Sequence, residues 1–180
     1  MSNPFIETYS GRQFHLLKPQ PDEVCIEDIA HSLAQQCRWT GQCRVFFSVA
    51  EHSRNVSFAC EPEDALWGLL HDAPEAYLSD LSAPLKHSGL FDNYRRVEAE
   101  VMKAVCAHFG LEYREGNLAP VSVEKADHDM LYREAITLMP AKWVPDSEHI
   151  VPLFNYGLEP VEAEKDFLLR YDQLRKERGL

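Results

Sequence analysis

Four residues with metal-ligand side chains interrupt apolar patterns in this sequence: His52, the adjacent pair His71 and Asp72, and Asp127. Imidazole and carboxylate groups are costly to bury unless a partner compensates them. Two imidazoles and two carboxylates suit a divalent ion and leave coordination positions for water and substrate. Such an ion lowers the pKa of its bound water and polarises a phosphoryl oxygen. We therefore expect these residues to hold a divalent ion (Mn, Co, Zn or Mg), provided that their side chains converge.

Each of these residues also has a simpler interpretation when it is taken alone. His52 could be a core histidine with a satisfied hydrogen bond, and the pair His71 and Asp72 could form a local cap. The joint occurrence of all four on apolar helix patterns favours the metal.

The elements that must position these side chains are predicted to be helices. Apolar residues recur with helical spacing in six stretches: 26–37, 49–59, 62–72, 91–109, 123–138 and 161–178. Ser48, with Glu51 three residues later, is typical of a capping box at the start of the second stretch. His52 then shares a face with Val56, and Asp127 lies on the apolar side of the fifth stretch.

The pair His71 and Asp72 poses a geometric question, because adjacent residues on a regular helix point about 100° apart. They reach one ion most easily where the helix is ending. Pro74 follows directly and predicts such an end.

The fold class predicted from these patterns is all-α, a single domain over residues 1–180 built from about six helices. The first twenty residues indicate an irregular or short extended entry, with Tyr9, Ser10 and Gly11 marking a turn. We find no stretch whose alternating pattern predicts a substantial sheet.

Composition limits the partners. The formal net charge of −11 repels polyanions, so a nucleic acid polymer is not expected to bind. No apolar run approaches the roughly 18 residues that cross a bilayer, so we expect no membrane association. The five cysteines are odd in number and lack a C-x-x-C pair, which favours a reducing, cytoplasmic setting.

The order of His52, His71, Asp72 and Asp127 resembles the H…HD…D signature of the HD-domain phosphohydrolases, a superfamily of helical metal-dependent enzymes. The segment SVAEHS (48–53) is similar to the family's E-H-S box. HDAPEAYLSDLSAPLK (71–86) resembles a run found in bacterial 5'-deoxynucleotidases and phage dATP triphosphohydrolases. IETYSG (6–11), IEDIAHSL (26–33) and CRWTG (37–41) are more like the phage-type enzymes. The resemblance covers about residues 6–138.

This resemblance implies His52, His71, Asp72 and Asp127 as metal ligands. The sequence departs from the two-metal HD enzymes, because no GYP motif and no extra histidine ligands follow, so we expect a single catalytic ion. The resemblance implies two catalytic carboxyl groups. Glu75 would handle the proton of the attacking water or of the leaving oxygen, and Asp80 would orient substrate or act in catalysis. Without the family match, Glu75 would be read as a solvated glutamate and Asp80 as a helix cap.

The resemblance also implies substrate-binding residues. Arg38 and Lys86 match positions that meet phosphate oxygens, with Arg44 as a competing choice to Arg38. Trp39 matches an aromatic residue that packs against the sugar at its 2' carbon, which would favour deoxyribose. The simpler interpretations are surface charges for the basic residues and a core position for Trp39.

The expected function is a metal-dependent phosphohydrolase acting on 2'-deoxynucleotides. The segments that resemble the phage-type enzymes favour release of triphosphate from a dNTP, dATP above all. The alternative is release of orthophosphate from a dNMP. Two other classes stay open: a nucleotide-binding HD domain without turnover, and an HD-like di-iron oxygenase, which would need further ligands. The relatives imply self-association as a homo-oligomer.

Overall fold

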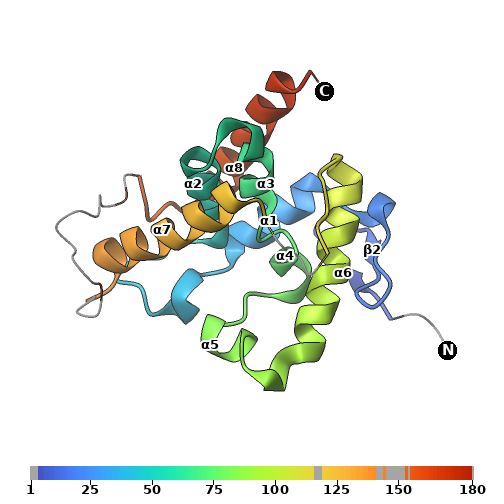
Figure 1. Ribbon diagram of the computed structural model, residues 1–180, viewed down its shortest axis with the longest axis horizontal. Helices are drawn as coiled ribbons and strands as arrows, with labels where there is room; N and C mark the ends of the chain where they lie inside the picture. The colour runs from blue at the N-terminus through green and yellow to red at the C-terminus, as the bar shows by residue number, and fades with distance from the viewer. Residues whose placement is uncertain (1–3, 116–118, 141–143, 145–152, 154, 180) are drawn as a thin grey trace.

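The computed structural model describes residues 4–115, 119–140, 144, 153 and 155–179, and most of them lie in helices (Figure 1). In these residues the sheet consists of two short antiparallel strands, β1 (Ile6–Glu7) and β2 (Gln13–Phe14). They form the extended entry that the N-terminal sequence predicted. The all-α prediction is confirmed.

Each of the six stretches with helical periodicity contains a helix. Their bounds are α1 (Ile26–Gln35), α2 (Val49–Ala59), α3 (Ala65–Leu70), α6 (Asp92–Phe109), α7 (Val121–Leu138) and α8 (Pro160–Glu177). The third is shorter than its pattern, because a 3-10 turn at Pro62–Asp64 precedes it and it ends at Leu70.

Short helices occur where periodicity predicted none. α4 (Glu75–Leu78) and α5 (Ala83–Lys86) have four residues each, too few for a helical repeat to be visible in the sequence. Further 3-10 turns lie at Pro21–Glu23, Arg38–Gly41 and Gly89–Phe91. α4 carries Glu75 and α5 carries Lys86, so two residues that line the candidate site lie in the least regular part of the fold.

α2 is the central helix and packs against α1, α3, α7 and α8. Figure 1 shows α7 running across the molecule next to α2 and α3, while α6 stands apart from them, near the N-terminal hairpin. A single connected cluster of buried apolar side chains extends from Phe14 of β2 to Leu174 of α8. Every long helix contributes to this core, which fixes how α2, α3 and α7 meet.

Gly68 sets the close approach of α2 and α3. A Cβ at this position would lie 2.9 Å from Cys60 Sγ and 3.3 Å from the Ser57 Cα atom. Both distances are shorter than ordinary van der Waals contact. The missing side chain therefore lets the helix that carries His52 lie directly beside the helix that ends at His71.

No helix in the described part of the chain combines the length and apolar character needed to cross a lipid bilayer.

The capping box predicted at the start of α2 is present. Ser48 Oγ accepts a hydrogen bond from the Glu51 backbone N–H at 3.1 Å, and Glu51 Oε2 accepts one from the Ser48 N–H at 2.9 Å. We predict that Ser48→Ala lowers the free energy of unfolding by about 1 kcal/mol, because the buried Glu51 N–H loses its acceptor and the Glu51 carboxylate loses the hydroxyl donor of Ser48. Urea unfolding measures this. Ser88→Ala, which removes only a local hydroxyl bond to the Leu85 carbonyl, is the control and should cost less than about 0.5 kcal/mol. Equal losses in the two variants would contradict the assignment.

Candidate metal centre

α2, the end of α3 and α7 bring the four predicted ligands together. His52 Nε2 lies 3.2 Å from His71 Nε2 and 3.0 Å from Asp127 Oδ1. Asp72 Oδ2 lies 3.3 Å from His71 Nε2 and 3.7 Å from His52 Nε2. Ligand atoms bound roughly 2.1 Å from a common ion lie about 3.0–3.5 Å from one another. His52, His71 and Asp72 therefore form a group that could hold a metal ion, and the half-exposed Asp127 carboxylate lies at its open side.

Both imidazoles turn the same nitrogen toward this point. His71 Nδ1 bonds the Gly68 carbonyl oxygen at 2.8 Å, and His52 Nδ1 bonds Glu134 Oε1 at 2.5 Å. Because these oxygens accept hydrogen bonds, each Nδ1 carries the hydrogen, and each Nε2 can offer its lone pair to an ion. A core histidine with one satisfied bond would explain the Nδ1 contacts but not two Nε2 atoms that face each other. The donor set therefore fits a divalent ion.

The carboxylates around His52 favour a positive charge there. Burial lowers the pKa of His52, but Glu134 and Asp127 outweigh this effect and raise it to about 9. Burial raises the pKa of Asp127, yet its hydrogen bond and attraction to His52 bring that pKa far below the ordinary value. A metal ion has to displace the His52 Nε2 proton, so ion binding should weaken as the pH falls.

The end of α3 explains how two adjacent residues reach one centre. The helix stops at Leu70, and the chain continues in tight turns in which the Ala73 N–H bonds the Leu70 carbonyl and the Glu75 N–H bonds the Asp72 carbonyl, each at 2.9 Å. This change from regular helix follows the prediction made from Pro74. His71 and Asp72 thereby direct their side chains to a shared point.

The metal-capable group opens onto a cavity of about 870 Å³. This volume suits a small organic ligand. The cavity brings together all five residues expected to act on substrate: Arg38, Trp39, Glu75, Asp80 and Lys86. Arg44, the competing choice to Arg38, is exposed and does not belong to the described lining.

Glu75 is buried in the cavity wall and carries the most perturbed carboxyl group there. Its Oε1 lies 3.2 Å from Lys86 Nζ, and its Oε2 has no hydrogen-bond partner among the described residues. Burial and the neighbouring Asp72 charge raise the pKa of Glu75 to about 8. Burial lowers the pKa of Lys86, but Glu75 and Glu98 reverse the effect and raise it. Lys86 is therefore a charged ammonium group held between two carboxyl groups.

Gln36, at the end of α1, holds both predicted catalytic residues in place. Its Nε2 donates to the Glu75 carbonyl at 2.9 Å, and its Oε1 accepts from the Asp80 N–H at 2.8 Å. One amide side chain thus spans both ends of α4. Asp80 follows Ser79, which adopts a positive φ of 70°, and burial raises the pKa of the Asp80 carboxyl.

Glu134 of α7 forms hydrogen bonds with the side chains of Arg38 and Trp39. The Glu134 Oε2 atom accepts hydrogen bonds from Arg38 Nε at 3.1 Å and from Trp39 Nε1 at 2.9 Å. Trp39 and Thr40 both have left-handed backbone conformations, with φ of 56° and 53°, followed by Gly41 at 74°. Such conformations cost roughly 1–3 kcal/mol for a non-glycine residue and are common at functional sites.

Sequence reasoning missed three residues of this site: Gln36, Glu98 and Glu134. For Glu134 a signal was present, because it lies seven residues after Asp127 and so shares its helix face. A second acidic residue on an apolar face pointed to the same site. Gln36 and Glu98 belong to no recognisable motif, and their roles follow only from the packing of α1 and α6 around α4 and α5.

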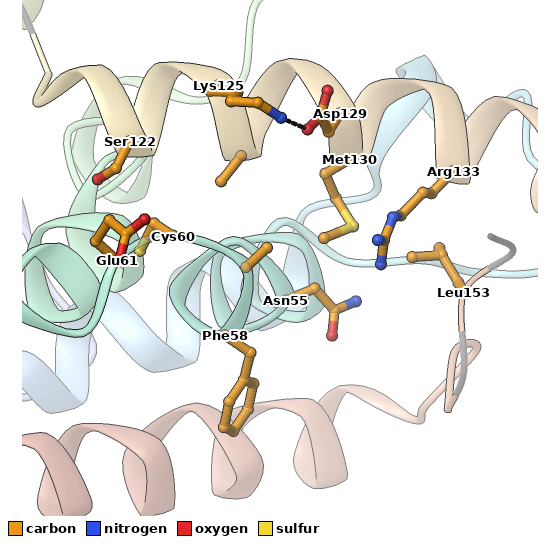
Figure 2. Close-up of a pocket in the computed structure, with 12 residues that line it drawn as sticks. Asn55, Phe58, Cys60, Glu61, Ser122, Lys125, Asp129, Met130, Arg133 and Leu153 are labelled. Carbon is orange, nitrogen blue, oxygen red and sulfur yellow. Dashed lines mark hydrogen bonds and ion pairs between the residues drawn. The ribbon is translucent and has the colours of Figure 1, made fainter. Parts of the chain in front are cut away.

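A second cavity, of about 500 Å³, lies between α2 and α7 (Figure 2). It uses the opposite face of α7, with Ser122, Lys125, Asp129 and Arg133, whereas Asp127 belongs to the metal side. Figure 2 shows Lys125 paired with Asp129 at its edge. The described lining contains no histidine and no group of metal ligands, so the catalytic candidate is the larger cavity.

No protein-family model matches the chain. A protein of Escherichia coli with the name "Uncharacterized protein YfdR" is 40% identical to it over 107 residues, which are 59% of this chain and 59% of that protein. An uncharacterized protein of Rhodobacter capsulatus is 42% identical over 111 residues, 57% of this chain and 56% of that protein. The chain therefore spans less than two thirds of each of these relatives, and neither name states an activity.

Proposed function

We propose that the protein is a metal-dependent phosphohydrolase that acts on 2'-deoxynucleotides. The observation that carries this proposal is the metal-capable group of His52, His71 and Asp72, of which His71 and Asp72 line a cavity that also contains Glu75 and the basic residues Arg38 and Lys86. A metal-capable group, a carboxyl group with a pKa near neutrality and positive charges in one cavity are the components that phosphoryl transfer to water requires.

The metal ligands and Glu75 have different roles in this reaction. The ion, held by His52, His71, Asp72 and Asp127, would supply Lewis acidity toward a phosphoryl oxygen and acidify a water molecule. Glu75 is protonated near neutral pH and can give its proton to the leaving 5' oxygen.

The other lining residues bind and orient the nucleotide. Arg38 and Lys86 would face the phosphate as fixed cations, held in place by the carboxylates of Glu134 and Glu98. Asp80 lies where it can orient the attacking water or the substrate. The Trp39 ring would pack against the sugar and leave a 2'-hydroxyl crowded and unsolvated, which favours deoxyribose.

The charge of the cavity bears on which nucleotide it accepts. With Glu75 protonated, its described lining contains the cations Arg38, Lys86 and Arg95 and the carboxylates Asp72, Asp80, Glu98, Glu124 and Asp127. Each of the three cations already has a carboxylate partner. A bound divalent ion offsets the surplus of carboxylates but leaves no excess of positive charge for the substrate. A monophosphate brings about two negative charges and a triphosphate brings more, so this balance favours the dNMP although the phage-like sequence favours the dNTP.

The decisive experiment measures release of orthophosphate and triphosphate from dNMPs and dNTPs in the presence of Mn, Co, Mg or Zn. We expect turnover with at least one metal and loss of activity in EDTA. His71→Ala should lose ion binding and turnover together, because it removes a ligand. Absence of turnover with every nucleotide and metal, in protein that still binds nucleotide, would replace the hydrolase by a nucleotide-binding domain.

The charge balance predicts the order of substrates. We expect kcat/KM for dAMP to exceed that for dATP, and the difference to shrink as ionic strength rises, because salt screens the repulsion of the triphosphate. Steady-state kinetics at two salt concentrations test this. A higher kcat/KM for dATP at low salt would show that the phage-type interpretation is correct.

Glu75→Gln should separate chemistry from ion binding. The amide keeps the shape of the side chain but cannot exchange a proton, so we expect kcat to fall by roughly 10²–10⁴ while the affinity for the ion is retained. Glu51→Gln, which changes a buried carboxylate of the α2 cap outside the cavity, is the matched control for stability loss. Wild-type turnover by Glu75→Gln would remove Glu75 from the mechanism.

The raised pKa of Glu75 also predicts a pH dependence of stability in metal-free protein. The unfolded chain releases this proton near the ordinary glutamate pKa of 4.5, whereas the folded protein keeps it until about pH 8. The contribution of Glu75 to stability is therefore fully present below about pH 4.5 and is lost as the pH rises toward 8. Urea unfolding in EDTA should show Glu75→Gln gaining stability relative to wild type across this window. A constant difference would mean that the carboxyl group titrates normally.

A further inference from the structure

Glu134 is a fully buried carboxylate that contacts three residues of the candidate site. It lies on α7, has an exposed fraction of 0%, and bonds His52, Arg38 and Trp39. Arg38 Nε and Trp39 Nε1 can only donate, so Glu134 Oε2 accepts both of these hydrogen bonds.

The two oxygens of Glu134 serve two different parts of the site. Oε1 accepts from His52 Nδ1, the nitrogen on the far side of the ring from the ligand group. Oε2 accepts from Arg38 Nε and from Trp39 Nε1. One carboxylate thus joins a predicted metal ligand to the two residues predicted to meet phosphate and sugar.

The segment that carries Arg38 and Trp39 has an unfavourable backbone conformation that other contacts must hold in place. Trp39 and Thr40 adopt left-handed backbone conformations, and Thr40 is β-branched, which makes this conformation especially unfavourable. A strained conformation persists only where surrounding contacts impose it. The bond from Trp39 Nε1 to Glu134 is a contact of this kind and fixes the direction of the ring.

We propose that Glu134 is a positioning residue that sets ion affinity and nucleotide recognition together, by holding His52 from one oxygen and the Arg38–Trp39 segment from the other. This inference rests on the proposed function and adds to it a link between the ion and the specificity residues. Glu134 is fully buried and does not belong to the described lining of the cavity, so it acts through the three residues that it bonds.

Glutamine at this position cannot reproduce the contacts. If its NH2 group faces Arg38 and Trp39, donors oppose donors. If it faces His52 instead, the ring has to accept at Nδ1 and carry its proton on Nε2, the atom that the ion needs. In either orientation one half of the site is lost.

The first test uses Zn²⁺ alone, measured by calorimetric titration of metal-free protein. We expect Glu134→Gln to bind roughly 10- to 100-fold more weakly than wild type, the usual consequence of removing a carboxylate behind a ligand histidine. Asp28→Asn is the matched control, because Asp28 is also buried and, among the residues that the structure describes, its carboxylate bonds Ser10 of the N-terminal segment and none of the site. Its affinity should equal that of wild type. Unchanged affinity in Glu134→Gln would overturn the proposal.

The second test concerns Trp39. Trp39→Phe removes the indole N–H and keeps an aromatic ring, so it should raise KM in the wild-type background and leave Zn²⁺ affinity unchanged. In the Glu134→Gln background the same change should have a smaller effect on KM, because the bond is already absent. Fully additive effects would contradict the link between Glu134 and Trp39.

A measurement on the wild-type protein covers the case in which Glu134→Gln does not fold. In Zn²⁺-loaded protein, nitrogen-15 NMR should show His52 with its hydrogen on Nδ1 and bonded. A hydrogen on Nε2 would overturn the role of Glu134. Failure of the wild type to bind any of Zn²⁺, Mn²⁺, Co²⁺ and Mg²⁺ would instead refute the proposed function, so the two failures are distinguishable.

Discussion

Mutual repulsion among carboxylates is the constraint to which the rest of this site responds. Asp72, Glu75, Asp80, Glu98 and Asp127 share one partly buried cavity, where their charges are poorly screened by solvent. The fold answers this repulsion in three ways. Glu75 keeps its proton, Lys86 is held between Glu75 and Glu98, and the imidazole nitrogens face the remaining carboxylates. A divalent ion would complete this compensation, so the arrangement favours an ion before any substrate is considered.

Helix packing holds these charged groups close together in spite of their repulsion. α2 is buried by α1, α3, α7 and α8, and the close approach at Gly68 brings His52 beside His71. The contact between His52 and Glu134 then ties α2 to α7, which carries Asp127. The ligands come from elements that the apolar core already fixes, so the site needs no independent source of rigidity.

Periodicity in the sequence predicted the six long helices, because each has an apolar face long enough to show a repeat. It could not predict α4 and α5, whose four residues contain barely one turn. The convergence of the four ligands was inferred from residue type and from a family resemblance, and the geometry brings them together. Sequence patterns could not predict the roles of Gln36 and Glu98, because only tertiary packing joins them to the site. Gln36 bonds Glu75 and Asp80, which lie 39 and 44 residues away, and Glu98 pairs with Lys86 of α5.

The left-handed turn at residues 39–41 shows how a local preference gives way to the demands of a site. An ordinary connection between α1 and α2 would place glycine or asparagine at such φ values, yet Trp39 and Thr40 occupy them. Their strain is compensated by contacts that exist only once α7 has packed, since Glu134 comes 95 residues after Trp39. The shape of the substrate side of the cavity therefore depends on the same helix as the metal side. A change in the packing of α7 should alter both, even where it touches no ligand.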